Sequence, residues 1–345
     1  MHIFVTGAAG LIGGEVCARL ADAEHRVTAL VRSNPDVLAN DGTPAAVAEV
    51  LTGDLSQDGM GLDPAVLERL AGKIDLVLHC AALTRFDLDE DAYRATNIDG
   101  TARALDLARQ AGAGFLHVST AYVCGDRSGP IGEDDPLPTG GFTNGYEASK
   151  AEAEALVRAS GVPFVIARPS IVVGDSRTGA IRQFDTIYAA FKLIAEGRVR
   201  HMPVSKGATL DFVSLDHVAA GIVALVERFD AAQGGTYHLV SGGPVPVEDF
   251  AAAIGSFDHF SAPVLADAAG FDSNMLHPLE RRLYKRVAAL YAAYFQRDPR
   301  FGDARLRAVT GLEPPVMDQA MLRKLISYCI DVGFLNAPEL QRTSG

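Results

Sequence analysis

Cysteine is scarce in this sequence, and the few cysteines that it contains follow no pattern. Four occur in 345 residues. They form neither a Cys-x-x-Cys pair nor the close, even spacing of a disulfide framework, which argues against a structural zinc site and a disulfide-stapled domain. We therefore expect free, reduced thiols and a cytoplasmic protein. The cysteines are Cys17, Cys80, Cys124 and Cys329.

The sequence also has fewer basic than acidic residues, and it lacks long apolar runs. The chain has 31 lysine and arginine residues against 43 aspartate and glutamate residues, a net charge of -12. This excess of negative charge opposes attraction to nucleic acids and anionic lipids. No apolar stretch reaches the roughly 18 residues that a membrane-spanning helix needs, and no basic segment followed by an apolar run opens the sequence. We expect a soluble protein with no nucleic-acid partner and no integral membrane segment.

The composition and rhythm that remain are those of an α/β protein. Hydrophobic residues make up 48% of the chain and charged residues 21%, as in ordinary globular proteins. Short apolar runs rich in Val, Ile and Phe alternate with helix-like stretches such as 11–20 and 100–110. This alternation indicates a parallel sheet covered on both faces, so we predict a Rossmann-type, doubly wound fold. The predicted strands are 2–6, 26–31, 49–53, 75–79, 115–119, 164–168 and 236–240.

Two long stretches, 174–208 and 241 onward, break this rhythm. In open α/β sheets, ligands bind beyond the carboxyl ends of the strands, where such stretches can form a roof. We therefore assign 1–175 and 209–240 to a dinucleotide-binding domain, and 176–208 and 241–345 to a smaller, mostly helical substrate-binding region. The sequence leaves open whether the protein is a monomer or a homodimer.

A glycine-rich turn, Thr6-Gly7-Ala8-Ala9-Gly10-Leu11-Ile12-Gly13, follows the first predicted strand. Its first glycine permits a tight bend, the next lets the backbone approach a pyrophosphate, and the last lets the helix pack closely on the sheet. A plain glycine-rich turn is the alternative, but the strand-turn-helix context favours a bound dinucleotide. The expected cofactor contacts in this turn are Gly7, Gly10, Leu11, Ile12 and Gly13.

The end of the second predicted strand distinguishes NAD from NADP. An acidic residue there would bind the adenosine ribose hydroxyls, whereas an arginine would pair with a 2′-phosphate. The strand ends in Val31-Arg32-Ser33, without a carboxylate. We predict that Arg32, together with Ser33, binds the 2′-phosphate of NADPH; an exposed loop arginine is the alternative. Further expected cofactor contacts follow the third and fourth strands, at Asp54, Leu55, Ala81 and Ala82.

Tyr146 and Lys150 are four residues apart, so that they would share one face of a helix. A lysine ammonium lowers the pKa of a nearby tyrosine, and the phenol can then protonate a carbonyl oxygen as a hydride arrives. The spacing alone is common, and a half-buried tyrosine beside a surface lysine is the alternative. Ser119 and Thr120, at the end of the fifth predicted strand, add hydroxyls that can hold a substrate carbonyl.

These motifs, with Asn97-Ile98-Asp99-Gly100-Thr101 between them, resemble the extended short-chain dehydrogenase/reductases over about the first 240 residues. Counting back from Gly125 matches Thr120, rather than Ser119, to the active hydroxyl of that family. The resemblance implies substrate orientation by Thr120, proton donation by Tyr146, ribose binding and tuning of the tyrosine by Lys150, and support of a proton-relay water by Asn97.

Further stretches resemble the branch of fatty acyl-CoA reductases and thioester reductases. In that branch the substrate is an acyl group on CoA or on an acyl carrier protein. Hydride attack on the thioester gives a hemithioacetal that collapses to an aldehyde, and a second hydride gives the alcohol. The resemblance implies an NADPH-dependent reductase with additional cofactor contacts at Pro169, Ser170 and Ile171. The stretches are Gly53-Asp54-Leu55-Ser56, His79-Cys80-Ala81-Ala82, Ser119-Thr120-Ala121-Tyr122-Val123, Arg168-Pro169-Ser170-Ile171-Val172-Val173-Gly174-Asp175 and Asp211-Phe212-Val213.

Other functions stay open on the sequence. A ketone or aldehyde reductase, or a hydroxysteroid-type dehydrogenase, would use the same motifs. A nucleotide-sugar epimerase or dehydratase would keep NAD tightly bound, and Arg32 argues against it. A non-catalytic dinucleotide sensor usually lacks the catalytic tyrosine or lysine, both of which are present. We predict no metal site, because His79, Asp216 and His217 lie in family-like segments without a further ligand at suitable spacing.

The C-terminal part contains a candidate basic amphipathic helix. Its apolar stripe either packs on the substrate-binding region, leaving the cations as a solvated face, or presents them to an anionic partner. Such a partner would be the phosphates of CoA or the acidic helix of an acyl carrier protein. The stripe is Leu279, Leu283, Val287, Leu290 and Tyr294, and the cations are Arg281, Arg282, Lys285 and Arg286.

Overall fold

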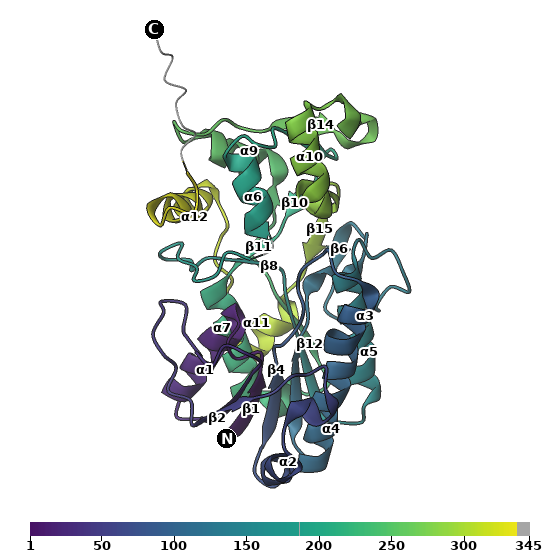
Figure 1. The fold of residues 1–345 in the computed structure, drawn as a ribbon, viewed down its shortest axis with the longest axis vertical. Helices are drawn as coiled ribbons and strands as arrows, with labels where there is room; N and C mark the ends of the chain where they lie inside the picture. Colours follow the sequence, from purple (N-terminus) through teal and green to yellow (C-terminus); the bar gives the residue numbers. More distant parts are fainter. Residues whose placement is uncertain (186, 337–345) are drawn as a thin grey trace.

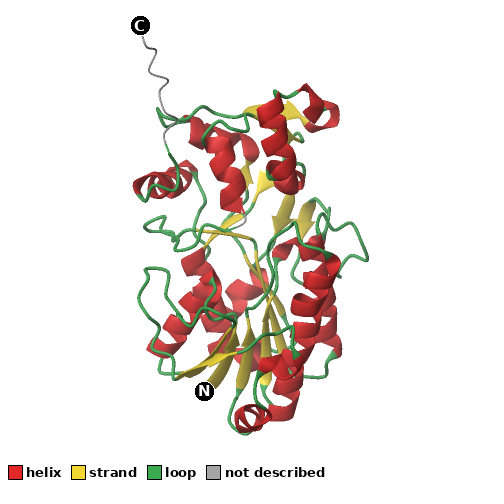
Figure 2. Cartoon of the chain, in the orientation of Figure 1, coloured by secondary structure: helices red, strands yellow, loops and turns green. Residues whose placement is uncertain are grey.

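The computed structural model describes residues 1–185 and 187–336, and its centre is a sheet of seven strands (Figures 1 and 2). The strand order is β12-β7-β5-β4-β1-β2-β3, and all neighbouring pairs are parallel. The predicted Rossmann-type sheet is confirmed. The strands are β1 (His2–Thr6), β2 (Arg26–Val31), β3 (Glu49–Thr52), β4 (Leu76–His79), β5 (Gly114–Val118), β7 (Phe164–Pro169) and β12 (Thr236–Leu239).

Helices cover both faces of this sheet, which is why every residue of β1 and β4 is buried. On one face α1 packs on α7, which in turn contacts α11; on the other, α4 contacts α2 and α5. Figure 1 shows these two groups on opposite sides of the strands. The helices are α1 (Leu11–Asp22), α2 (Pro64–Ala71), α4 (Asp99–Ala111), α5 (Gly145–Ala159), α7 (Leu215–Glu227) and α11 (Ala304–Thr310).

The order of the strands determines where a ligand can bind. The chain runs outward from β1 through β2 to β3, and then returns to place β4 on the other side of β1. The loops that follow β1 and β4 therefore diverge, and they leave a crevice at the carboxyl ends of these strands. The glycine-rich turn directly follows β1 and lies at this switch point.

A second region lies above the carboxyl ends of the strands, at the top of Figure 1. Its core is rich in aromatic and large aliphatic residues. Its helices are α6 (Ile187–Ala195), α9 (Val247–Gly255), α10 (Pro278–Arg286) and α12 (Gln319–Asp331). Short strands pair around it: β8 (Ile171–Val173) with β11 (Phe212–Ser214), β9 (His201–Val204) with β14 (Val264–Asp267), β10 (Thr209–Leu210) with β13 (Val245–Pro246), and β6 (Gly129–Ile131) with β15 (Pro299–Phe301). The remaining short α-helices are α3 (Glu90–Tyr93) and α8 (Phe229–Ala232).

The late helix α11 returns to the Rossmann sheet. It packs on β12 and α7, and its Leu306 belongs to the core beneath that face. Glu133, buried in an earlier loop, accepts hydrogen bonds from the backbone N–H groups of His238 (3.0 Å), Arg305 (2.7 Å) and Leu306 (3.2 Å). The division into 1–175 with 209–240 and 176–208 with 241–345 stays a proposal, with the qualification that Leu306 packs in the core of the first unit.

The candidate basic helix is shorter than the sequence suggested. α10 ends at Arg286, and a 3₁₀ helix, η6 (Ala288–Phe295), follows it. The tighter winding of η6 turns the later stripe positions off the face of α10. Leu279 is 64% exposed, and Tyr284, outside the predicted stripe, is the buried residue of α10. The cations Arg282, Lys285 and Arg286 are exposed.

Candidate active site

The glycine-rich turn packs backbone against backbone. Gly7 has φ +71°, a left-handed conformation that side chains disfavour. A Cβ atom on Gly7 would lie 2.6 Å from the amide nitrogen of Ala81, and one on Gly13 would lie 2.2 Å from the carbonyl oxygen of Gly7. Side chains are thus excluded from the bend where β1 becomes α1. The arrangement fits the pyrophosphate of a dinucleotide, which needs close backbone approach at a helix N-terminus.

A buried histidine fastens the turn to the sheet. His79 Nδ1 lies 2.8 Å from the Thr6 hydroxyl, and its Nε2 lies 3.0 Å from the Thr101 hydroxyl. Burial lowers the pKa of His79 to about 3, so the ring is neutral. Both ring nitrogens are engaged by hydroxyls, which gives His79 a structural role.

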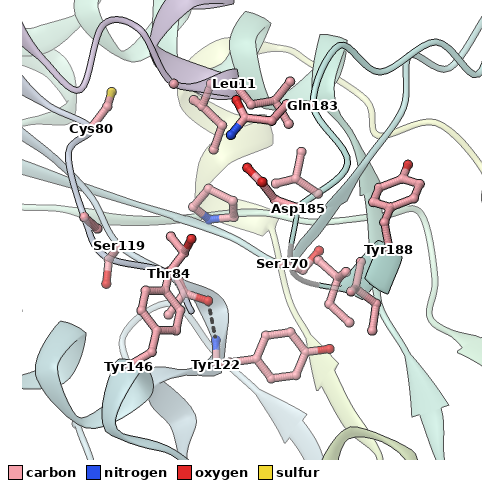
Figure 3. Close-up of a pocket in the computed structure, with 18 of the residues that line it drawn as sticks. Leu11, Cys80, Thr84, Ser119, Tyr122, Tyr146, Ser170, Gln183, Asp185 and Tyr188 are labelled. Carbon is pink, nitrogen blue, oxygen red and sulfur yellow. Dashed lines mark hydrogen bonds between the residues drawn. The ribbon is translucent and has the colours of Figure 1, made fainter. Parts of the chain in front are cut away.

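A cavity of about 330 Å³ lies between the turn and the second region. In Figure 3, Ser119 and Tyr146 lie on one side of this cavity and Tyr188 on the other. The cavity therefore joins the glycine-rich turn, the end of β5 and the start of α5. The predicted site residues that line it are Gly7, Gly10, Leu11, Ile12, Gly13, Ala82, Thr120, Tyr146, Pro169, Ser170 and Ile171.

Tyr146 and Thr120 both face this cavity. Tyr146 is in the first turn of α5, which begins there because the Asn144 side chain accepts a hydrogen bond of 2.9 Å from the Glu147 N–H. Burial, with a smaller contribution from the charge of Glu147, raises the pKa of Tyr146, while the Thr120 hydroxyl acts in the opposite direction. The expected lowering by Lys150 is therefore wrong for this structure, in which desolvation dominates. The phenol is neutral and keeps a proton to donate.

Lys150 lies one helical turn further along α5 and is buried. Its ammonium donates a hydrogen bond of 2.8 Å to the Val118 carbonyl and lies 3.1 Å from Nε2 of His117. Burial lowers the pKa of Lys150 to about 8, and the charge of Glu154 partly offsets this effect. The pKa of His117 is lowered well below its usual value by burial and by Lys150, so the ring is neutral and accepts from the ammonium.

Asn97 joins two segments of the site. It lies in a π-helical turn, η2 (Arg94–Ile98), a distortion that often occurs at functional sites. Its side chain accepts from the Leu83 N–H at 2.7 Å and donates to the Leu83 carbonyl at 3.1 Å and to the Ser149 hydroxyl at 2.9 Å. Asn97 thus ties the loop after β4 to α5; its support of a relay water stays a prediction.

The residues expected at the adenosine end lie outside the cavity wall. Arg32 and Ser33 are exposed after β2. The Asp54 carboxylate accepts from the N–H (2.9 Å) and hydroxyl (2.8 Å) of Ser56, and these bonds lower its pKa, with a smaller effect of Arg32. The Leu55 side chain is buried in the core of the sheet, so only its backbone is available to a cofactor. Ala81 contacts the glycine-rich turn through its backbone.

Sequence reasoning missed an aromatic wall of the cavity. Phe86 stacks on Tyr294 and on Tyr146, with ring centres 5.7 and 6.0 Å apart, and its ring is tilted against that of Tyr291 at 5.1 Å. The two tyrosines come from η6, about 150 positions after Tyr146 in the printed sequence. The one available signal was the density of aromatics in 288–295, in a segment without a recognisable motif.

Arg182 was also missed. Its Nη2 donates to the Gly10 carbonyl at 3.2 Å, so a cation from the second region reaches the phosphate-binding turn. Its backbone N–H donates to the Asn40 side chain at 2.9 Å, and Asn40 donates to the Ala180 carbonyl at 2.9 Å. These bonds hold the segment before α6 against the loop after β2. Gln183 and Asp185 follow it and face the cavity (Figure 3).

Within residues 1–185 and 187–336, no group of three His, Cys, Asp or Glu side chains is arranged to hold a metal ion. Within them, too, no helix has the length and apolar character required to cross a bilayer.

Comparison with known proteins identifies relatives of this chain. A family model described as Male sterility protein matches residues 5–222. A glycine betaine reductase from Emericella nidulans is 30% identical over 278 residues, which are 71% of this chain and 21% of that protein. A ketoreductase of a farnesylated dihydroquinoline oxide from Stigmatella aurantiaca is 31% identical over 72% of this chain and 71% of its own length. The chain spans only 21% and 25% of the first two curated relatives.

Solved structures include relatives of the same kind. The terminal R domain of the myxalamid PKS-NRPS pathway superposes with a TM-score of 0.81 at 29% identity, covering 98% of this chain and 92% of that one. A UDP-glucuronic acid 4-epimerase from Bacillus cereus, solved with NAD, has a TM-score of 0.67 at 22% identity and covers 96% of this chain and 99% of its own. The second comparison bears on the fold alone.

Proposed function

Because the chain belongs to the Male sterility family of extended short-chain dehydrogenase/reductases, and is thus an oxidoreductase that reduces carbonyl groups, we propose that it is an NADPH-dependent thioester reductase. Its substrate would be an acyl group on CoA or on an acyl carrier protein, and its product the aldehyde or the alcohol. The observation that carries this proposal is the meeting of Thr120, Tyr146 and the glycine-rich turn at one cavity. The likeness to a terminal R domain over nearly the whole chain supports it.

The residues of the cavity are suited to reduction of a carbonyl. Bound NADPH would supply the hydride. Thr120 would hold the carbonyl oxygen by a hydrogen bond, and the neutral phenol of Tyr146 would give its proton to that oxygen as negative charge develops there. The Lys150 ammonium, now bonded to Val118 and His117, lies on the same helix and would bind the nicotinamide ribose. Asn97 would support the path that returns a proton to Tyr146.

The residues at the end of β2 support a preference for NADPH. Arg32 is exposed there and can turn toward a 2′-phosphate, with the Ser33 hydroxyl as a second donor. Asp54 lies near enough for Arg32 to affect its pKa, but it also accepts two hydrogen bonds from Ser56. Because Ser56, and not Arg32, is bonded to the Asp54 carboxylate, the Arg32 guanidinium is available to a phosphate. Asp54, Leu55 and the alanines after β4 would contact the adenine and ribose through short side chains or backbone.

A ketone reductase is the second candidate, because a specific comparison favours it. The Stigmatella aurantiaca relative is a ketoreductase, and the match covers 71% of that protein, whereas the first curated relatives are several times longer than this chain. The same Thr120 and Tyr146 hydroxyls would serve a ketone. The two candidates differ in whether the substrate carries a sulfur leaving group.

Oxidation of NADPH on a panel of acyl-CoAs, carrier-bound acyl groups, aldehydes and ketones tests the proposal, with the products identified by mass spectrometry. We expect consumption of acyl thioester with release of free thiol. Turnover of ketones alone, with thioesters untouched, would replace the proposal by the second candidate. Purification with NAD bound and no net oxidation of NADPH would instead favour a nucleotide-sugar epimerase.

A further inference from the structure

A second, smaller cavity adjoins the active site. Its volume is about 40 Å³, and it shares Ile187 and Tyr188 with the main cavity. These two residues lie in the first turn of α6 and line both cavities, so the side cavity begins where the main cavity ends. The remaining wall residues come from α6 itself and from β8, β11, α9 and α12; they are Val173, Phe191, Phe212, Phe250, Leu322, Leu325 and Ile326.

The wall of this side cavity offers almost nothing to a polar ligand. Within residues 1–185 and 187–336, it contains no charged side chain, and its one side-chain hydroxyl belongs to Tyr188. That hydroxyl already accepts a hydrogen bond of 3.1 Å from the Gly174 N–H. Burying an unpaired polar group there would be unfavourable by about 1–3 kcal/mol. An occupant must therefore be a hydrocarbon.

The position of the side cavity relates it to the reaction. In Figure 3, Tyr188 lies across the main cavity from Tyr146 and Ser119. A carbonyl held by Thr120 and Tyr146 would direct one of its substituents toward Tyr188. On the proposed function that substituent is the acyl chain, because the thiol side must lead outward to CoA or a carrier.

We propose that the side cavity binds the end of an unbranched aliphatic acyl chain and thereby selects the length of the substrate. The inference rests on the proposed thioester reduction in one respect, that the bound hydrocarbon is an acyl chain. The apolar binding itself does not depend on it, because the alkyl tail of an aldehyde or ketone would bind in the same way. A volume of about 40 Å³ accommodates roughly three groups the size of water or a methylene. Branched or charged tails would be rejected.

A series of straight-chain substrates tests this assignment. Acyl-CoAs and the matching free aldehydes from butanoyl to dodecanoyl would be compared by kcat/KM. Burial of each methylene in the side cavity should raise kcat/KM about fourfold, over about three successive methylenes, after which the value should level or fall. A flat profile in both series would overturn the inference while leaving thioester reduction in place. A length-dependent profile with aldehydes, together with inert thioesters, would overturn the thioester proposal and retain the side cavity.

Paired variants separate the side cavity from general effects on the core. Leu322→Phe, on α12, should fill the side cavity and move the preferred length to shorter chains. Phe250→Leu should enlarge it and move the preference to longer chains. Leu322→Met keeps the volume and Phe260→Leu removes a buried ring outside the wall, so neither should move the preference. If a variant loses activity at all chain lengths, thermal melting shows whether it has failed to fold. A change of the preferred chain length in the same direction in Leu322→Phe and Phe250→Leu would overturn the inference.

Discussion

The guanidinium of Arg297 lies 2.8 Å from the carboxylate of Glu147, the residue that follows Tyr146 in the chain. Both side chains are buried. The Tyr294 hydroxyl donates to the same carboxylate oxygen at 2.8 Å, and Arg297 also donates to the Gly125 carbonyl. The guanidinium also lies over the rings of both Tyr122 and Tyr294, 4.8 and 4.6 Å from their centres. A residue of the second region thus fixes the start of α5.

Arg297→Met should destabilise the protein by about 3–5 kcal/mol, because it leaves the Glu147 carboxylate buried without its cation. It should also lower kcat more than it raises KM, since Tyr146 is displaced with α5. Arg300→Met is the matched control, because Arg300 pairs with Asp298 at the surface, where such a pair contributes about 1 kcal/mol or less. Urea unfolding and steady-state kinetics measure both effects. Equal stabilities of the two variants would contradict this role of Arg297.

Tyr146→Phe should lower kcat about 100-fold or more, because it removes the proposed proton donor. Cofactor affinity should change little, since the ring and its stacking on Phe86 remain. Lys150→Ala, by comparison, should weaken both turnover and cofactor binding. Stopped-flow hydride transfer and fluorescence titration with NADPH separate the two quantities. Retention of most activity by the phenylalanine variant would mean that the proton comes from another group.

Two arginines should affect the cofactor in different ways. Arg32→Ala should weaken NADPH binding by about 1.5–3 kcal/mol and spare NADH, because a charge-assisted contact to the 2′-phosphate is lost. Arg182→Ala should weaken both cofactors alike, because Arg182 reaches the glycine-rich turn, where the pyrophosphate shared by both would lie. Titration of each variant with each cofactor measures the difference. Equal efficiency of the unmodified enzyme with NADH and NADPH would rule out the assignment of Arg32.

Cofactor binding should weaken as pH rises through about 8, because the pKa of Lys150 lies at about 8. Below this pH the ammonium is present and can donate to the ribose; above it the amine is neutral and a weaker donor. In Lys150→Arg the affinity for NADPH should be the same below and above this pH, since a guanidinium does not lose its proton. Dissociation constants of NADPH measured on either side of the transition test this. If the NADPH affinity of the unmodified protein does not change near pH 8, Lys150 does not titrate in this range.

The exposed cations of α10 allow a test of partner docking. Arg282→Glu with Lys285→Glu should raise KM for a carrier-bound or CoA substrate and leave a small aldehyde unaffected, and the KM of the unmodified enzyme should rise with salt. Arg26→Glu with Lys73→Glu is a control of equal charge change at the amino ends of β2 and β4, away from the cavity. If the two double variants behave alike, α10 is only a scaffold.

The sheet and the glycine-rich turn could be predicted because their signals are local. β1 and β2 have the predicted bounds; β3, β4, β7 and β12 differ from theirs by one residue at one end, and β5 is shifted by one residue at both ends. The buried runs are bounded by turns, and the glycines are required by backbone contacts such as that of Gly7 with Ala81. The assignment to extended short-chain dehydrogenase/reductases is confirmed for the same reason, since its motifs lie in these segments.

The upper half of the site could not be predicted, because tertiary contacts assemble it. Tyr294 and Phe86 stack although more than half of the chain separates them. The change from α10 to η6 also interrupts the apolar stripe inferred from periodicity: its first member, Leu279, is exposed, although its last, Tyr294, is buried as expected. The direction of the pKa shift of Tyr146 depended in the same way on burial, which the Tyr-x-x-x-Lys spacing does not encode.

The return of α11 to the sheet has a consequence for the order of folding. Leu306 packs in the core between α7 and β12, and the Glu133 carboxylate obtains two of its three backbone donors from Arg305 and Leu306. During synthesis the sheet can assemble as soon as β12 has left the ribosome. The part of that face that α11 covers, over β12 and beside α7, stays open, and Glu133 lacks two backbone donors, until some seventy further residues follow. In this interval the nascent chain exposes apolar surface, which is where chaperone binding and aggregation compete with folding. The protein should therefore fold nearly as one unit.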